Sequence, residues 1–377
     1  MLQRLTDNRP AEFTLFDAGL TYFCHQICNK VDNAADPLPE GIVMALKEKI
    51  LQLLEANKGK SISGNKIATQ MNVSRSAVWK AVNLLREEGY SINGGTNRGY
   101  CLTSDNDKLS EPAIQNMLKT KYIGKSIDMF KTIDSTNTFA KSLAQLGAES
   151  GHVVAAEHQT EGRGRMGRQF FSPNCQGIYM SVIIRPNIPI EQAMGITACA
   201  AVAVCDAIEE SIADIESPGK REGNADHCMI KWVNDIYLND RKVCGILTEA
   251  SVGIEQGGLD YVVLGFGINV NNYNFPDELR NTATSIRLEC GESVSRTKLA
   301  ASLLNHLEQR LEELGKSSLM DEYRRRLVLS GRIIDVENNG ITERFECLGV
   351  DDIGRLLVKR GNGQELALTS GTVTVLS

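Results

Sequence analysis

The sequence has 377 residues, of which 42% are hydrophobic and 23% charged, as in a globular protein of two or three domains. Its net charge of −6 argues against nucleic acid as the partner of the whole surface, and neither a run of about 18 apolar residues nor a signal peptide is visible. The longest apolar stretch, 193–208, carries Asp206 and predicts a buried helix. The ten cysteines form no CxxC pair, which favours free thiols. We therefore expect a cytoplasmic protein without a membrane partner.

Residues 1–43 differ in composition from the rest of the chain. They hold three of the nine prolines, show no clear period and end in a linker-like stretch. The apolar patch Phe13–Ile27 is compatible with one helix but contains no chemical motif. Met44 stands directly before the first well-patterned segment, and we expect it to be the translation start.

Residues 44–106 have the pattern of a winged helix-turn-helix domain. Apolar residues recur at helical spacing over 46–54, and a second helix is predicted to start at Ser63. Ser74 is predicted to cap a third helix that ends at Gly89. Two short alternating segments around the glycine-rich turn 93–99 then indicate a hairpin.

This segment is also basic. From Met44 to Ser104, nine Lys or Arg residues face four Glu, a charge of about +5 in an otherwise acidic chain. A third helix of this kind fits the DNA major groove with its first residues at the bases. We expect the DNA-facing side chains to be Ser74, Arg75, Ser76, Trp79 and Lys80, with Arg98 on the wing. Protein binding is the alternative role of such domains.

After a polar linker at 105–108, strand-like and helix-like segments alternate, and the arginine-rich loop 161–168 stands out. Gly162, Gly164 and Gly167 formally match GxGxxG, but 169–173 reads as strand and turn instead of the helix that a dinucleotide fold needs. Arginines spaced by glycines suit an anion trap, because backbone N–H groups and guanidinium forks bind the same oxygens. We expect this loop to be mobile until an anion binds. A solvated surface loop is the alternative.

Two lysines and a carboxylate lie in the next pair of motifs, Lys231–Asp235 and 240–247. Two strands joined by a polar turn fit this run. Lys231 and Lys242 are suited to pairing with a triphosphate, and Asp235 to holding Mg²⁺ or orienting a lysine. Taken singly, either lysine would be read as a surface residue.

Two further motifs are weaker. Gly265 and Gly267 alternate after the strand Tyr261–Leu264 and leave one face bare for something flat, although packing glycines are as common. The polar run Asp134–Asn137 lies at a strand-to-helix junction, where an N-cap and a ligand contact are both compatible with it.

The tail is predicted to be a small all-β domain. Short alternating runs from residue 331 onward are separated by the turns 338–340 and 361–363, as in a small barrel of the SH3 type. We therefore predict an α+β protein with an N-terminal extension (1–43), a winged helix (44–106), a central domain with a mixed sheet and helices (107–328) and an SH3-like domain (329–377).

In this order the motifs resemble the bifunctional biotin–protein ligase and biotin operon repressor family, over about residues 44–377. The resemblance rests on GRGRMGR at 162–168, KWVND at 231–235 and GFGIN at 265–269. Val233 replaces the usual proline of the second motif and leaves its lysine and carboxylate in place. The resemblance implies a class II synthetase-like core that forms biotinyl-5′-AMP from biotin and ATP with Mg²⁺.

It further implies transfer of biotin to a lysine of biotin carboxyl carrier protein, and repression at operator DNA with the adenylate as corepressor. A homodimer when adenylate-bound, and no tightly bound prosthetic group, are implied as well. By resemblance Arg165, Lys231 and Lys242 are catalytic. The implied biotin and adenylate contacts are Ser135, Thr136, Asn137, Gln159, Gly162, Arg163, Gly164, Arg165, Arg168, Asn234, Lys242, Gly265, Gly267 and Asn269.

Three alternatives stay open from the residues. The first is a non-catalytic regulator in which the winged helix is fused to a ligand sensor. The second is lipoate–protein ligation, although the RRxSGG-type loop of those enzymes is absent. The third is a nucleotide-binding scaffold without transfer activity.

Overall fold

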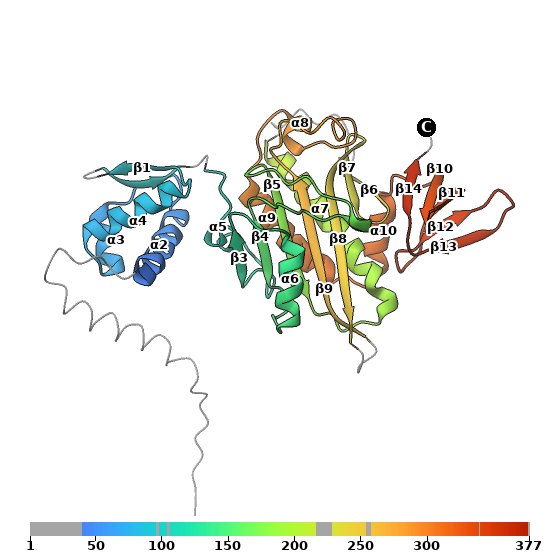
Figure 1. Cartoon of the computed structure of the whole chain (residues 1–377), viewed down its shortest axis with the longest axis horizontal. Coiled ribbons are helices and arrows are strands. Elements are labelled where there is room, and N and C mark those ends of the chain that lie inside the picture. The colour runs from blue at the N-terminus through green and yellow to red at the C-terminus, as the bar shows by residue number, and fades with distance from the viewer. Residues whose placement is uncertain are drawn as a thin grey trace, which may run out of the picture.

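The computed structural model describes residues 40–95, 98–103, 106–215, 228–253, 258–338 and 340–375. The helix expected over Phe13–Ile27 lies outside the described residues. Along the chain a helical region with a hairpin comes first, a large mixed sheet covered by helices follows, and a small antiparallel sheet comes last (Figure 1). The predicted α+β class is confirmed.

The N-terminal region has the predicted helix, helix, turn, helix and hairpin. Its elements are α2 (Glu40–Glu55), α3 (Gly64–Met71), α4 (Arg75–Glu87), β1 (Ile92–Gly95) and β2 (Gly99–Leu102). Met44 lies within α2 and not directly before it. Ser63 and Ser74 cap α3 and α4, accepting hydrogen bonds from Lys66 N and Ala77 N. Because the caps are local signals, the sequence locates both helix starts.

The described strands of the central region form a seven-stranded sheet in the order β3-β4-β5-β9-β8-β7-β6, in which only β3 and β4 are parallel. Its strands are β3 (Ile127–Phe130), β4 (Val153–Ala156), β5 (Gly177–Ile184), β6 (Cys228–Lys231), β7 (Asp235–Leu238), β8 (Arg241–Val252) and β9 (Leu259–Asn269). Its helices are α5 (Glu111–Gln115), α6 (Thr136–Gln145), α7 (Ala193–Ile215), α8 (Ile286–Cys290), α9 (Arg296–Leu311) and α10 (Ser317–Arg325), with 3-10 turns η1 (Arg165–Gly167) and η2 (Ile190–Gln192).

Helices cover both faces of this sheet (Figure 1). On one face α7 and α9 pack over the main core, and on the other α6 packs over a smaller cluster that includes Ala140, Val154 and Val263. The apolar residues around all sides of α7 reflect burial, as predicted for 193–208. Among the described helices, none is long and apolar enough to cross a bilayer.

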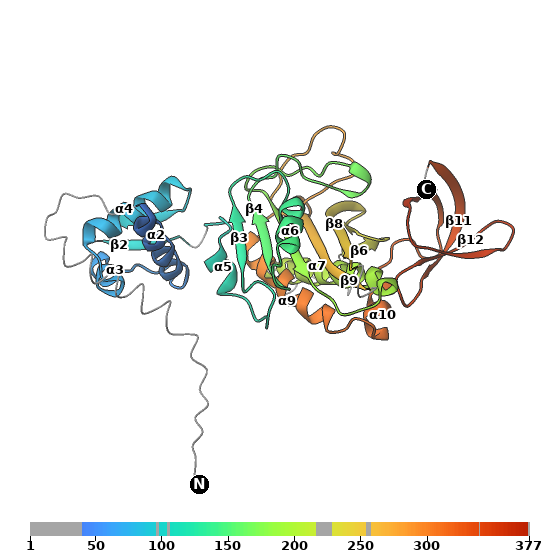
Figure 2. The same ribbon diagram turned by 60° about the horizontal axis from the view of Figure 1, so that its bottom comes forward.

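The predicted short strands of the tail are present as β10 (Ile333–Asn338), β11 (Ile341–Val350), β12 (Leu356–Lys359), β13 (Glu365–Leu368) and β14 (Thr372–Val375). They form one antiparallel sheet in the order β13-β12-β11-β10-β14, with β13 and β14 at its edges. Figure 2 shows this sheet at one end of the molecule and the N-terminal helices at the other, with the central sheet between them.

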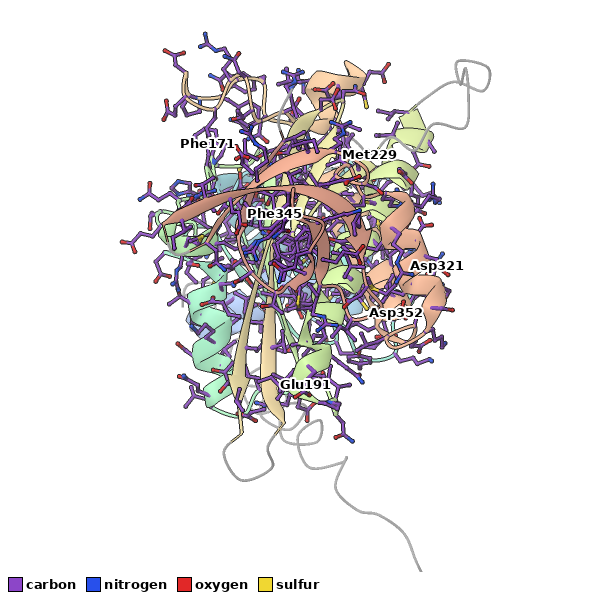
Figure 3. All side chains as sticks on the ribbon, turned by 90° about the vertical axis from the view of Figure 1, so that its right-hand side faces the viewer. Phe171, Glu191, Met229, Asp321, Phe345 and Asp352 are labelled. Atoms are coloured by element: carbon purple, nitrogen blue, oxygen red, sulfur yellow. The ribbon has the colours of Figure 1, made fainter. Side chains whose placement is uncertain are left out.

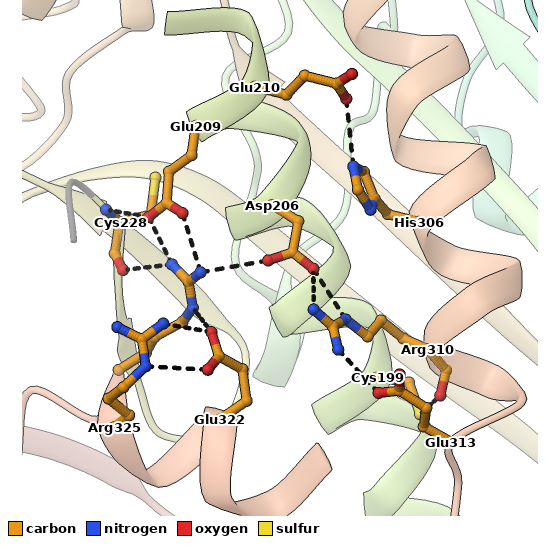
Figure 4. Close-up of polar contacts among 11 residues, drawn as sticks. Cys199, Asp206, Glu209, Glu210, Cys228, His306, Arg310, Glu313, Glu322 and Arg325 are labelled. Carbon is orange, nitrogen blue, oxygen red and sulfur yellow. Dashed lines mark hydrogen bonds and ion pairs between the residues drawn. The ribbon is translucent and has the colours of Figure 1, made fainter. Parts of the chain in front are cut away.

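An ionic network joins α7 to α9 and α10 (Figure 4). Arg310 on α9 pairs with Asp206 on α7 at 2.8 Å. Arg326, directly after α10 and 4% exposed, pairs with Asp206, Glu209 and Glu322. Burial alone lowers the pKa of Arg326, but the hydrogen bonds to Glu209 and Glu322 oppose it, and the pKa lies above its usual value. The network anchors the start of the C-terminal region to the long core helix.

The predicted polar linker between the first two regions is anchored. On the N-terminal side, Lys58 Nζ donates to the Asn106 carbonyl at 2.7 Å. On the other side, Arg296, 1% exposed, donates to the Asp107 carboxylate from its backbone N and its Nε at 2.7 and 2.9 Å, and from Nη1 to Glu157 Oε2 at 2.5 Å. Burial lowers the pKa of Arg296, but the two carboxylates more than offset this and raise it.

We expect Arg296→Ala to lower the free energy of unfolding by about 3–5 kcal/mol, because Glu157 would be left as a buried, unpaired charge. Urea unfolding at neutral pH, followed by circular dichroism, measures the change. Arg280→Ala is the matched control, since its ion pair with Asp277 is exposed and worth less than about 1 kcal/mol. Equal losses for the two variants would contradict the structural role of Arg296.

Candidate active site

A cavity of about 370 Å³ lies beside the start of α6 and over the glycine-bearing part of β9. The expected substrate contacts line it, with the exception of Gly162. Further lining residues include Met166, Gln169, Phe170, Phe171, Trp232, Asp235, Tyr237, Gly245, Ile246, Leu247 and Phe266, joined by Phe275, Leu279, Thr282, Ala283, Gly371, Thr372 and Val373. The structure thus gathers motifs that are up to 134 positions apart, from Ser135 to Asn269.

Positive charge dominates the lining. The described residues around the cavity include five cations and one carboxylate, namely Arg163, Arg165, Arg168, Lys231 and Lys242 with Asp235. Lys242 Nζ lies 2.7 Å from Asp235 Oδ1, and Arg165 Nη1 donates to Asn234 Oδ1 at 3.0 Å. Arg163 Nη1 lies 3.9 Å from Glu249 Oε1, outside the lining, so three of the five cations make no salt bridge among the described residues. This arrangement suits a ligand with several negative charges.

Lys231 is the least satisfied of these groups. Its Nζ has no hydrogen-bond partner in the described part of the chain and lies 5.7 Å from the centre of the Tyr237 ring. Burial lowers the pKa of Lys231, Asp235 partly opposes this, and repulsion from Lys242 lowers the pKa further. A bound anion would reverse these effects, so charged Lys231 and an anionic ligand favour each other.

A preorganised polar wall lies opposite the cations. Gln159 Oε1 accepts from Thr136 N at 2.9 Å and from Thr136 Oγ1 at 3.1 Å, while Gln159 Nε2 donates to Ser172 Oγ at 3.1 Å. Ser181 Oγ donates to Thr136 Oγ1 at 2.8 Å. Ser135, 2% exposed, uses its hydroxyl oxygen to cap α6, which leaves its proton to donate to a ligand.

The two glycines of β9 make room for protein groups. A Cβ on Gly265 would lie 2.0 Å from Asn137 Oδ1, and a Cβ on Gly267 would lie 2.6 Å from the Phe170 ring. The flat group against the bared strand is therefore an aromatic ring of the protein. Asn137 Nδ2 donates to Glu249 Oε2 at 3.0 Å, so its amide is held by neighbours before any ligand arrives.

The arginine-rich loop is a closed turn. Gly164 N donates to the Arg168 carbonyl and Phe170 N to the Gly162 carbonyl, each at 2.8 Å. Gly162 is buried, and a Cβ there would lie 2.6 Å from both the Phe170 carbonyl and Ser172 Oγ. Gly162 is thus needed for close packing behind the loop. No helix follows at 169–173, in agreement with the exclusion of a dinucleotide fold.

Asn269 presents a free acceptor. The residue is 4% exposed, lines the cavity, and its Oδ1 has no hydrogen-bond partner among the described residues. A buried acceptor without a partner is costly, and a ligand N–H would satisfy it.

Several lining residues carried no signal in the sequence. Phe275 and its neighbours come from the connection after β9, and Gly371–Val373 come from the far end of the chain. Thr372 Oγ1 lies 3.4 Å from Met166 Sδ, so β14 contacts the tip of the arginine loop. Phe170 and Phe171 follow that loop after Gln169, and their place in the sequence was the one clue to their position.

The expected DNA-facing side chains are exposed on one surface of α4 and on the wing, with Trp79 50% exposed. Ser74 Oγ also caps α4 and lies 2.8 Å from Ser76 Oγ. Arg86, which the sequence analysis did not single out, donates from Nε to Ile92 O and from Nη2 to Gly94 O, and so holds the wing against α4.

Known protein families match the N-terminal region and the central region separately. Residues 47–101 match the model of an HTH domain, and residues 129–269 match the Biotin/lipoate A/B protein ligase family. The chain is 35% identical to the bifunctional ligase/repressor BirA of Bacillus subtilis (strain 168), over 84% of this chain and 95% of the relative. The chain belongs to the bifunctional ligase/repressor family.

Other members of this ligase/repressor family agree. The protein of the same name from Escherichia coli (strain K12) is 31% identical, over 70% of this chain and 76% of that protein. A biotin protein ligase from Aquifex aeolicus in complex with biotin and ATP has the same fold, with a TM-score of 0.55 and 24% identity over 67% of this chain and 99% of that one. The family identified by resemblance is thereby confirmed.

We expect Gly265→Ala to lower the free energy of unfolding by about 1–3 kcal/mol, because the new methyl group would displace the Asn137 side chain from its hydrogen bonds. Thermal and urea unfolding measure this loss. Gly361→Ala is the control, since a Cβ there meets open space and should change the stability by less than about 1 kcal/mol. A Gly265→Ala protein as stable as the control would show that this close approach is unimportant.

Proposed function

We propose that this chain is a biotin–protein ligase that forms biotinyl-5′-AMP from biotin and ATP, transfers biotin to a lysine of biotin carboxyl carrier protein, and represses transcription from operator DNA. Ligase and repressor roles follow from membership of the ligase/repressor family. The observation that carries the chemistry is the cavity with five cations, one carboxylate and a polar wall.

In the first step a biotin carboxylate oxygen attacks the α-phosphorus of ATP, the bond to the β-phosphate oxygen breaks, and pyrophosphate leaves. Both reactants are anionic where they meet, so cations must hold them together. Arg165 and Lys242 would contact the carboxylate and α-phosphate, and Lys231 would stabilise the added charge in the transition state. Positioning and charge stabilisation can supply most of the rate.

The polar wall would take the ureido ring of biotin. The Ser135 hydroxyl would donate to the ring, because only its oxygen is used to cap α6. Gln159 and Thr136 hold each other in place by hydrogen bonds. Phe170, which covers Gly267, offers an aromatic surface to the apolar part of the ligand. Asn269 offers its unpartnered acceptor to an adenine N–H.

Asp235 is the residue that would hold Mg²⁺, which supplies charge neutralisation on the triphosphate when bound. Asp235 would supply only part of the Mg²⁺ coordination, because the described residues contain no group of three His, Cys, Asp or Glu side chains placed for a metal. Mg²⁺ commonly takes one or two carboxylates and completes its shell with water and phosphate oxygens. Lys242 shares the Asp235 carboxylate and would orient it.

In the second step the neutral amine of the acceptor lysine attacks the acyl carbon of the adenylate, and AMP leaves as the amide bond forms. The cavity is bordered by Thr372 and Val373 of the C-terminal sheet, so the carrier protein would approach beside that sheet. The amine must lose its proton before attack, and the cationic lining favours this deprotonated state.

For regulation, we propose that the adenylate orders the arginine-rich loop and favours a homodimer, which presents two winged helices to a two-fold operator. Sedimentation and operator binding, each with and without biotin and ATP, test this. An operator affinity that does not respond to biotin plus ATP would remove the idea.

The function is tested by incubating the full chain with ATP, Mg²⁺, biotin and an apo carrier domain. We expect the carrier to gain the mass of one biotin, and no gain with lipoate in place of biotin. Biotin-dependent pyrophosphate exchange separates an enzyme from a non-catalytic regulator or scaffold, alternatives that family membership does not support.

Lys242→Ala should slow biotin-dependent pyrophosphate exchange by about 10²–10³-fold, the scale of one lost electrostatic donor in a transition state. Removal of Lys242 also leaves Asp235, the one carboxylate of the described lining, without its 2.7 Å partner. Lys298→Ala, on an exposed lysine of α9, is the matched control. Near-normal exchange in Lys242→Ala would refute its role.

Arg165→Ala should speed adenylate dissociation by about 10- to 100-fold, because a charge-assisted hydrogen bond is worth about 1.5–3 kcal/mol. Rapid-dilution release of radiolabelled adenylate measures this rate. Arg344→Ala, on an exposed arginine of β11 that pairs with Asp335 and does not line the cavity, should leave the rate unchanged. The role of Arg165 fails if both variants retain the adenylate equally well.

A further inference from the structure

The turn that carries Lys231 and Asp235, called here the catalytic turn (residues 231–235), is held from two sides. Lys231 pairs with Asp235 across the start of the β6–β7 hairpin. On the cavity side, Asn234 accepts from Arg165 and donates to the Ile246 carbonyl at 2.6 Å. On its other side, the catalytic turn contacts residues from much later in the chain.

Two side-chain hydrogen bonds connect the catalytic turn to the C-terminal part of the protein. Trp232, 3% exposed, donates from Nε1 to the Gly354 carbonyl at 3.0 Å. The hydroxyl of Tyr323, 1% exposed, donates to the Val233 carbonyl at 3.2 Å. Both donors are buried, so loss of either acceptor would leave a costly unpaired group.

The backbone reinforces this contact. Ile230, directly before the catalytic turn, donates to the Arg326 carbonyl at 2.8 Å and accepts from Val328 N at 3.0 Å. The segment that leads into the C-terminal sheet therefore lies against β6 like an added parallel strand, with Ile230 opposite Leu327. The ionic network of Arg326 fixes this segment in turn.

The Gly354 carbonyl belongs to a rigid loop, 351–355, between β11 and β12. Asp351 accepts from Ile353 N at 3.1 Å and from Arg355 N and Nε at 2.8 and 2.6 Å. Arg324 ties the loop to α10 by bonding Asp321 and Asp352, which lie close together in Figure 3. The loop thus offers a fixed acceptor to Trp232.

We propose that Trp232 and Tyr323 are positioning residues through which the C-terminal part of the chain holds the catalytic turn, and with it Lys231, in the reactive geometry. This inference rests on the proposed ligase function. Lys231 Nζ makes no hydrogen bond of its own to the described residues, so its place depends on the backbone that carries it and on the Tyr237 ring. The two clasping bonds fix that backbone on either side of the Trp232–Val233 peptide.

The clasp, meaning the Trp232–Gly354 and Tyr323–Val233 hydrogen bonds, has a signature that general destabilisation would not produce. It holds the turn that carries Lys231 and does not contact the polar wall. Breaking the clasp should therefore lower kcat per folded enzyme and leave KM for biotin nearly unchanged, whereas a disturbed cavity would raise KM. Two changes at opposite ends of one of these bonds should also be less than additive.

The test uses the full-length chain with Trp232→Phe and Tyr323→Phe, measured by biotin-dependent pyrophosphate exchange. We expect kcat to fall by about tenfold in each, while KM for biotin changes by less than about twofold, because the polar wall of Gln159 and Thr136 does not contact the turn. Tyr261→Phe is the matched control, because this buried tyrosine does not line the cavity and its hydroxyl makes no hydrogen bond within the described part of the chain.

A variant in the C-terminal sheet avoids altering the turn itself. Asp351→Asn weakens the 351–355 loop, and we expect a smaller fall in kcat, again with KM for biotin nearly unchanged. In the double variant with Trp232→Phe, Asp351→Asn should lower kcat by less than it does alone. Unchanged kcat in folded clasp variants, or a raised KM alone, would overturn the proposal. A wild-type chain without biotin-dependent exchange would instead refute the ligase function.

Discussion

Mutual repulsion among cations is the constraint around which this site is built. Five Lys and Arg side chains share one cavity with a single lining carboxylate among the described residues. Burial comes first among the causes that lower the pKa of both Arg165 and Lys231, which shows that their charged forms are held at a cost. The five cations come from three elements, the arginine-rich loop, β6 and β8. Hydrogen bonds close the loop, and ladder pairs hold the two strands, so the cations are kept in place without a ligand. An anionic ligand would relieve the repulsion between them.

Residues close to the cavity also connect the three regions of the chain. Glu157, which binds buried Arg296 and the linker, lies two residues before Gln159 of the polar wall. Asn271, which donates to Asp107 at 3.0 Å, lies two residues after Asn269. The linker to the DNA-binding region is therefore docked on residues adjacent in sequence to the cavity. At the other end, the C-terminal sheet contacts both the catalytic turn and the tip of the arginine-rich loop.

Much of the fold was accessible from the sequence because its signals are local. Capping serines located the starts of α3 and α4, alternating apolar residues located the short strands of the tail, and a long apolar run indicated the buried helix α7. The exclusion of a dinucleotide fold also followed from local pattern, since strand-like residues follow the arginine-rich loop. Met44 was misplaced relative to its helix because helix starts without a cap leave little trace.

The sequence by itself determined the residue types of the site, because cations, glycines and a carboxylate in three short motifs already indicate an anion-binding cavity. Only the tertiary structure decided how each of them is placed around the cavity. Gly162 packs behind the loop, Gly265 makes room for Asn137, and Gly267 is covered by Phe170, since the atoms that a Cβ would meet come from other elements. The roles of Trp232, Tyr323 and Gly354 likewise depend on contacts across 90 to 122 positions of sequence, and no local pattern encodes such distances.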